Sequence, residues 1–429
     1  MKHKLFLKGT MIISSLVFSI AASAQSKALS LEECRKMALE NNKRIISAQL
    51  QVDAAKANYE VAKTNALPTI DASVMGVHLG NPLDQIQVIP SDFASASIDV
   101  KQPIYAGGKI KLNKEASSKT IEVYQSQKVL TETEVLLGVE KGYWLIVQAK
   151  EKVTLAQKYR EMLKSLRQDL KNAVDAGLTY KNDLLRSEVN LNQAELNIIK
   201  ANDALVLAKL NFSQIIGQAG DTNFAITDEV SGDFTSLLEI PNENVADNRP
   251  EIDMLKKAID VEKIKTKIIK AEVKPQVGLS LSGFSSYGDK INFSNGNDNL
   301  TSYYSTIGLT MPVFDWGKNR KKVKEQNFKI QSKQAELEEQ KELVDIEVQN
   351  AYLQLNQSVK RINLSNSSLK QADENLRLAN DRYRVGTIIG KDVLEAQVIW
   401  QEAYSNTIDS KVEYKVNVAN YKKAIGELK

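Results

Sequence analysis

The chain has very little of the chemistry that most enzymes and metal sites need. Its 429 residues include one cysteine, Cys34, and two histidines, His3 and His78. One cysteine excludes an intrachain disulfide and a thiolate metal cluster, and so few histidines exclude a multi-histidine zinc site. Carboxylates alone could still support catalysis, but no other feature of the sequence indicates it. We therefore expect no catalytic residue, no bound metal and no cofactor.

Net charge is also nearly absent once the first residues are set aside. Residues 1–24 are typical of a secretory signal peptide, with a basic start, an apolar core at Met11–Ala22 and a small-residue cleavage site ending at Ala24. An N-terminal membrane anchor is less favoured because the apolar run is short, and Gln25 in place of cysteine argues against lipid attachment. This segment holds three of the 57 basic residues and none of the 53 acidic ones, which leaves 54 against 53. A near-neutral exported chain has no electrostatic reason to bind nucleic acid.

The sequence contains one long unit twice. Matched residues recur at a constant offset of 209 over roughly 115 residues without a gap. The clearest pairs are Pro103 and Pro312, Gly108 and Gly317, Tyr143 and Tyr352, Gly177 and Gly386, Asp183 and Asp392, and Gly217 and Gly426. Two copies are too few for a short-repeat solenoid and favour a pseudo-symmetric ring or tube that other subunits complete.

Most of each copy is predicted to be helical, since helix-forming residues dominate and the chain has only eight prolines. In the second copy large residues recur every seven positions from Val348 to Tyr383, with small residues three positions later, which is a coiled-coil heptad. Two uninterrupted helices of about 100 Å are expected at about 1.5 Å per residue. The predicted helices are Lys109 to Asp175 and Lys318 to about Arg384, shorter returns at about 181–216 and 391–425, and two further helices at about 29–66 and 249–273. Taken alone, this region would fit an ordinary soluble coiled coil.

Four short segments alternate between apolar and polar residues, as β-strands do in a membrane barrel. They centre on residues 70–75, 95–101, 277–282 and 306–311. No segment beyond the leader has about 18 consecutive apolar residues, so no transmembrane helix is expected. Four strands cannot close a barrel, and an open strand edge is not tolerated in lipid, so the chain must form oligomers. Three copies would give 12 strands, although two or four copies would also give an even number.

The predicted organisation is a signal peptide at 1–24, a first repeat at 25–217, an equatorial linker at 218–247 and a second repeat at 248–429. Each repeat would contain a helix, a β-hairpin and a long helical hairpin. The hairpins are expected at about 69–102 and 276–311, and the helical tips near Gly177 and Gly386.

The layout and motifs resemble the TolC-like outer-membrane efflux protein family over essentially the whole mature chain. The residues that carry the resemblance are Leu29 to Asn42, the paired turns Gln102 to Lys109 and Met311 to Lys318, and the segment from Val385 through Ala396. The resemblance implies a mainly α fold with a small β part. Duplicated long helical hairpins would form a coiled-coil periplasmic barrel, and four transmembrane strands per chain would form a 12-strand outer-membrane β-barrel as a trimer.

The resemblance also implies a function without catalysis. The chain would be the outer-membrane exit duct of a tripartite efflux or type I secretion system, set in outer-membrane lipid as a homotrimer. Its partners would be a periplasmic adaptor (membrane fusion) protein and an inner-membrane transporter of the RND, ABC or MFS type. The alternative is a structural coiled-coil envelope protein without channel activity, which explains the heptads but not the paired strand hairpins. The substrate is left open.

The resemblance places two sets of functional residues near the helical tips. The adaptor-docking residues would be Gly177, Leu178, Thr179, Gly386, Thr387 and Ile388. The periplasmic gate would involve Asp183, Arg186, Asp392 and Glu395, where three-fold symmetry could make an acidic ring that attracts cations. Arg186 departs from the pattern, because an acid is expected there; it could pair with an acid or weaken the ring. Acids in the first turns of a helix are favoured in any case, so both readings stay open.

Overall fold

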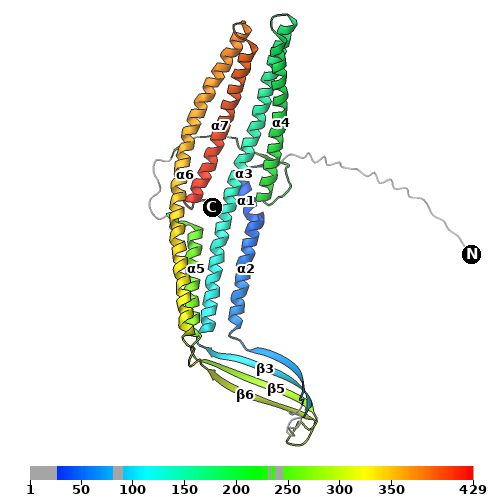
Figure 1. Cartoon of the computed structure of the whole chain (residues 1–429), viewed down its shortest axis with the longest axis vertical. Coiled ribbons are helices and arrows are strands. Elements are labelled where there is room, and N and C mark those ends of the chain that lie inside the picture. Colours follow the sequence, from blue (N-terminus) through cyan, green and yellow to red (C-terminus); the bar gives the residue numbers. More distant parts are fainter. Residues whose placement is uncertain (1–26, 81–89, 230–231, 233, 237–244, 429) are drawn as a thin grey trace, which may run out of the picture.

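The computed structural model describes residues 27–80, 90–229, 232, 234–236 and 245–428. The predicted signal peptide lies outside these residues. The described chain is a bundle of long helices that meets a curved four-stranded sheet at one end (Figure 1). No helix in the described part is both long and apolar enough to cross a membrane. The mainly α fold with a small β part is confirmed.

The two repeats supply matching elements in the same order. The first repeat contains α1 (Leu31–Asn41), α2 (Lys43–Thr64), β2 (Thr69–His78), β3 (Asp92–Ala106), α3 (Lys109–Asp175) and α4 (Lys181–Ile215). The second contains α5 (Pro250–Ala271), β5 (Gln276–Gly288), β6 (Asn299–Thr310), α6 (Lys318–Arg384) and α7 (Gly390–Ala424). Helices α3 and α6 each have 67 residues, α4 and α7 each have 35, and both pairs keep the 209-residue offset.

The sequence predicted one helix at about 29–66, but the structure breaks it in two. Asn42 has an extended backbone (ψ 127°) and its side chain accepts a hydrogen bond from the Arg44 backbone at 2.8 Å, so it caps the start of α2. Its amide also donates to the Ile215 carbonyl at 2.7 Å, at the C-terminal end of α4. The break at Asn42 therefore connects the end of α1, the start of α2 and the end of α4. Helix propensities along the sequence do not indicate such a contact.

The linker between the repeats contains short elements that the sequence did not indicate. A parallel pair forms between β1 (Lys27–Leu29) and β4 (Phe224–Ile226), and a 3₁₀ helix, η2, spans Val245–Asn248. Strand β4 contacts α3, whereas η2 contacts α5 and α6.

The sheet has the strand order β2-β3-β5-β6, and every pair is antiparallel. One face carries Val100 opposite Ile70 and Leu281, and the other carries Asp99 opposite Asp71 and Ser282. The sheet thus has one apolar and one polar face, as the alternation predicted. Within the described residues, β2 and β6 each have one edge without a strand partner.

Helix α3 lies at the centre of the bundle and packs against α2, α4, α5 and α7, whereas α6 packs mainly against α5 and α7. The largest core surrounds Tyr143 and Phe212, both completely buried. Polar contacts also cross between the repeats: Gln148 and Lys152 of α3 bond the Asp409 carboxylate of α7 at 2.6 and 2.7 Å. These contacts hold the two helical hairpins in a fixed relation.

Candidate functional site: the helical tips and the groove between them

Both helical tips are built by the same helix-ending turn. In the first repeat the Leu178 N–H donates to the Ala173 carbonyl at 2.8 Å, and the Gly177 N–H donates to the Val174 carbonyl at 3.0 Å. This is a Schellman motif, which requires a left-handed residue, and Gly177 supplies it with a φ of 71°. In the second repeat Gly386 (φ 76°) takes the same place, and the Thr387 N–H donates to the Arg382 carbonyl at 2.9 Å.

The six predicted docking residues are not equally accessible. Leu178 is 81% exposed, and Gly177, Gly386 and Thr387 are also exposed. Thr179 and Ile388 are half-buried, and Ile388 packs against a tip core that contains residues from α3, α4 and α7. Leu178 is therefore an apolar side chain at the end of a long hairpin that the described residues leave largely uncovered.

The tip core explains why the two hairpins stay together. It contains Tyr159, Leu163, Leu166 and Leu170 of α3, Ala194 of α4, and Val393 and Leu394 of α7. Gly390 begins α7, and a Cβ there would lie 2.7 Å from a methyl of Leu170. The absence of a side chain at Gly390 therefore allows α7 to pass close to α3.

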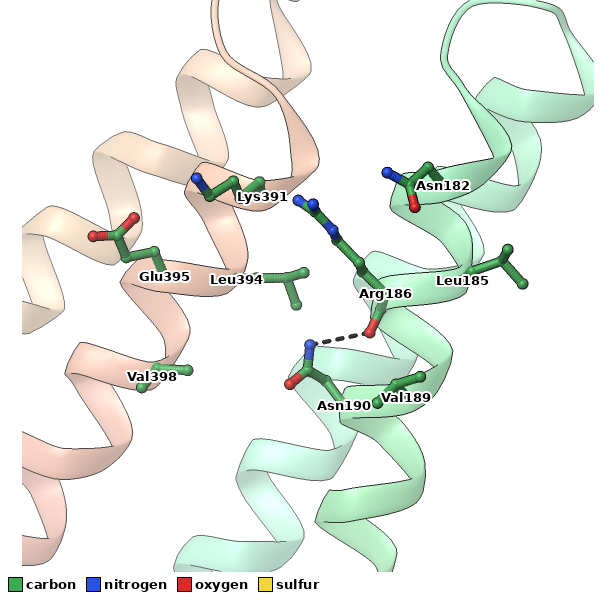
Figure 2. A pocket seen from close by; sticks show the side chains of 9 residues that line it. All are labelled: Asn182, Leu185, Arg186, Val189, Asn190, Lys391, Leu394, Glu395 and Val398. Atoms are coloured by element: carbon green, nitrogen blue, oxygen red, sulfur yellow. Dashed lines mark hydrogen bonds between the residues drawn. The ribbon is translucent and has the colours of Figure 1, made fainter.

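Beside this core, an open groove lies between the two return helices, α4 and α7. It is lined by Asn182, Leu185, Arg186, Val189 and Asn190 from α4, and by Lys391, Leu394, Glu395 and Val398 from α7. Figure 2 shows the Arg186 side chain extended across the groove toward Lys391, with Glu395 pointing away from it. Leu185, Val189, Leu394 and Val398 make much of the groove lining apolar, and the Lys391 amine, like Glu395, points away from Arg186 (Figure 2).

The structure brings only two of the four predicted gate residues to this groove, Arg186 and Glu395. Arg186 has no acidic partner within 4.0 Å among the described residues of this chain, so an Arg186–acid pair does not form within the single subunit. Asp392 is exposed and accepts a 3.3 Å hydrogen bond from the Ile389 backbone, as an acid in the first turn of a helix commonly does.

Asp183 is half-buried and is not among the residues that line the groove. Burial raises the pKa of the Tyr383 hydroxyl, and the negative charges of Asp169 and Asp183 raise it further. Because Tyr383 belongs to α6, this effect places the Asp183 charge close to the opposite hairpin. The first-repeat acid therefore contributes to the surface where the two hairpins approach each other.

Sequence reasoning missed two unpartnered apolar stripes, one along α4 and one along α6. On α4 the exposed residues of the stripe are Leu185, Val189, Leu196, Ile199, Val206 and Leu210, and Leu207 beside it is also exposed. On α6 they are Phe328, Leu343, Ile346, Leu353, Leu364 and Leu378. The α4 stripe follows alternating steps of three and four residues, interrupted by Asn192 and Asp203. That spacing was readable in the sequence and would have marked a second coiled-coil seam.

The fold consists of duplicated helical hairpins attached to a sheet with one apolar and one polar face. This combination is typical of channel-forming proteins of the outer membrane. The sequence profile of the outer membrane efflux protein family matches residues 34–218 and 243–427. The two matched segments are themselves 209 residues apart, which agrees with the internal duplication. The chain belongs to the outer membrane efflux protein family and is an outer-membrane efflux channel.

Named relatives cover nearly the whole chain at low identity. The outer membrane protein TolC of Vibrio cholerae is 21% identical over 93% of this chain and 91% of its own length. Among solved structures, the outer-membrane channel OprN superimposes with a TM-score of 0.78 at 18% identity, covering 92% of this chain and 89% of that one. The Campylobacter jejuni CmeC outer membrane channel also gives 0.78, at 17% identity, covering 92% and 85%. At these identities the solved structures show a shared fold.

Proposed function

We propose that three copies of this chain form a closed tube, which serves as the passive outer-membrane exit duct of a tripartite efflux or type I secretion system. The observation that carries the assembly is the pair of open sheet edges. Strand edges cannot remain unpaired in lipid, and the free edges of β2 and β6 are different surfaces, so successive copies join head to tail. Three sheets of four strands then make a barrel of 12 strands.

The helical part supports the same assembly. Helix α4 of the first repeat and helix α6 of the second, which carry the apolar stripes, lie at opposite sides of the helical part (Figure 1). A head-to-tail ring places one stripe against the other and removes both from water. An ordinary envelope coiled coil would bury such stripes as well, but it would not need the two-faced sheet with open edges.

The assembly is tested by charging one stripe. Leu196→Glu with Ile199→Glu on α4 should abolish heat-resistant trimers in mild detergent and the conductance of the purified protein in planar bilayers. Gln193→Glu with Asn202→Glu, on exposed positions outside the stripe, adds the same charge and should preserve both. Trimers that persist with the charged stripe would contradict this interface.

The docking role rests on the tips. Exposed Leu178 and Thr387 lie at the ends of the hairpins furthest from the sheet, where a periplasmic adaptor would reach the tube (Figure 1). Leu178→Glu should prevent co-purification of the adaptor with the channel while leaving the trimer and its conductance intact.

The proposed duct also has a cation-attracting gate, formed by Asp392 and Glu395 of the three copies. Its test is the ion selectivity of Asp392→Ala with Glu395→Ala, which should fall if three copies bring these acids together.

A further inference from the structure

The junction between the sheet and the helices carries a concentrated positive charge. We define the junction band as residues 105–114, 267–274 and 313–324. These residues include eleven lysines and arginines and two acids, Glu272 and Asp315, although the mature chain as a whole is nearly balanced. Because all three segments meet where the sheet ends, the charges form one zone rather than three separate ones (Figure 1).

Most of these cations are exposed and lack an acidic partner, although Lys114 lies over the Tyr59 ring and Lys324 over the Phe328 ring. Ten of the eleven have no acidic group within 4.0 Å in the part of the chain that the structure describes: the half-buried Lys109 and nine exposed side chains. The exposed ones are Lys111, Lys114, Lys267, Lys270, Lys274, Lys318, Arg320, Lys321 and Lys324. The two acids of the band are already engaged. Glu272 pairs with Lys322 at 2.7 Å, and Asp315 accepts the backbone N–H groups of Gly317 and Asn319 at 2.9 and 2.8 Å.

An exposed aromatic pair lies beside these cations. Phe314 is 71% exposed and Trp316 is 84% exposed, and their rings contact each other edge to face with centroids 4.8 Å apart. Exposed rings of this size need an environment that is apolar at one end and polar at the other, and the boundary between lipid and water provides it.

Comparison of the repeats shows that Trp316 has an unfavourable backbone conformation. Trp316 has a φ of 54°, in the left-handed region that non-glycine residues rarely adopt. The equivalent residue in the first repeat is Gly107, with a φ of 65°, where a Cβ would lie 2.8 Å from the Ala271 carbonyl oxygen. The turn therefore favours glycine, and the second repeat keeps a tryptophan against that preference. A side chain retained in a strained position indicates a gain from what it contacts.

We infer that the junction band binds anionic phospholipid headgroups at the periplasmic surface of the outer membrane. This inference rests on the proposed function, which sets the sheet in the membrane and the helices in the periplasm. Trp316 and Phe314 lie at the boundary, and the cations occupy the first two turns beyond it, within about 10 Å of the headgroups and thus within a Debye length. Each cation near an anionic surface favours binding by about fivefold.

The natural tryptophans make a direct test of this inference. The chain has three, and Trp144 and Trp400 are buried in the helical bundle far from the sheet, so only Trp316 can be quenched by lipid. The purified protein is reconstituted in vesicles that contain either brominated phosphatidylglycerol or brominated phosphatidylcholine, and quenching gives the relative binding constant. We expect at least tenfold preference for phosphatidylglycerol at low salt, decreasing as salt is added.

The variant Lys318→Gln with Arg320→Gln and Lys321→Gln should reduce that preference by tenfold or more. Its matched control is Lys360→Gln with Lys370→Gln and Arg382→Gln, which removes three exposed charges from the same helix more than about 60 Å away and should change nothing. Equal quenching by both lipids, or an unchanged preference in the junction variant, would overturn the inference. Conductance of the same vesicles separates the outcomes: conducting protein without lipid preference rejects only the junction band. Protein that never inserts rejects the proposed function and this inference with it.

Discussion

Helices α3 and α6 have the same length and the same place in their repeats, yet their surroundings differ. Tyr143 on α3 is completely buried and its hydroxyl donates to the Asp228 carboxylate at 2.9 Å. Its counterpart on α6, Tyr352, is half-buried. Helix α3 has neighbours on several sides, whereas α6 forms one edge of the bundle. The two repeats therefore share the same helices, but the place of each helix in the bundle decides which of its side chains are buried within one chain.

The comparison also shows where the assembly is unfinished. The exposed leucines on α6 lie on the edge helix, which among the described elements packs mainly against α5 and α7. In a head-to-tail ring the next copy of the chain would pack against α6. The exposed side chains of α6 would then be buried as those of α3 already are. Under the proposed ring assembly, the differences between the repeats reflect surfaces that become buried only when the copies associate.

The largest expected difference between the repeats is at this tyrosine pair. Tyr143→Ala removes a buried ring and its hydrogen bond and should destabilise the detergent-purified protein by about 4 kcal/mol. Tyr352→Ala removes a half-buried ring and should cost about 1 kcal/mol. Thermal unfolding of both variants measures the difference. Similar losses would show that α6 is as deeply packed as α3, contrary to the arrangement described here.

The second-largest expected difference is at the equator, the middle of the molecule where the return helices α4 and α7 end. Each repeat uses a different side chain to bond the last carbonyls of its return helix. Arg249 is 2% exposed; it donates to the Lys423 and Ala424 carbonyls, both at 2.9 Å, and pairs with Glu251 and Glu347. In the first repeat the uncharged Asn42 performs the corresponding task at Ile215. Two different side chains hold equivalent helix ends.

Arg249→Met should therefore cost about 3 kcal/mol, because it leaves two carbonyls and the Glu251 carboxylate without their donor, whereas Glu347 keeps its bond from Lys423 at 2.7 Å. Asn42→Ala should cost about 1 kcal/mol. The measurement is the unfolding temperature of each variant against the wild type. The double variant distinguishes the two sites further: additive losses are expected, and strong non-additivity would mean that the equator behaves as one unit.

Much of this architecture could be predicted from the sequence because it depends on local signals. Gly177 and Gly386 each follow a heptad helix and precede another helix, which identifies a left-handed helix end. The alternation around Ile70 and Val100 gave the two faces of the sheet correctly, since pairing places residues of the same parity opposite each other.

What could not be predicted depends on tertiary contacts. The break at Asn42 exists because its side chain reaches Ile215, 173 residues away. The pairing of β1 with β4 joins two segments of three residues each, which are too short to show an alternating pattern. At the tips, sequence and resemblance named Arg186 and Glu395 as gate residues, but only the structure shows that Glu395 points away from Arg186 (Figure 2). Whether the acids meet in a ring depends on neighbouring subunits and stays a prediction.

The smallest expected difference between the repeats is in their response to acid. Burial works against a charge on Glu347, but the hydrogen bond from Lys423 and the charge of Arg249 outweigh it and lower the pKa of this carboxyl below its ordinary value near 4.5. The equivalent residue in the first repeat is Gly138, so that repeat has no such carboxylate.

A carboxyl whose pKa is lowered by folding stabilises the protein above its unfolded pKa, and this contribution is lost as pH falls through the folded value. The stability that Glu347 provides should therefore be complete above about pH 5 and decline below pH 4.5. Because the group is partly exposed, the effect should stay below about 1 kcal/mol. Unfolding temperatures of the wild type and Glu347→Gln should differ at pH 7 and converge as the solution is acidified. A gap that stays constant with pH would show that Glu347 acts through packing rather than through its charge, and the acid sensitivity of the equator would then have to come from another group.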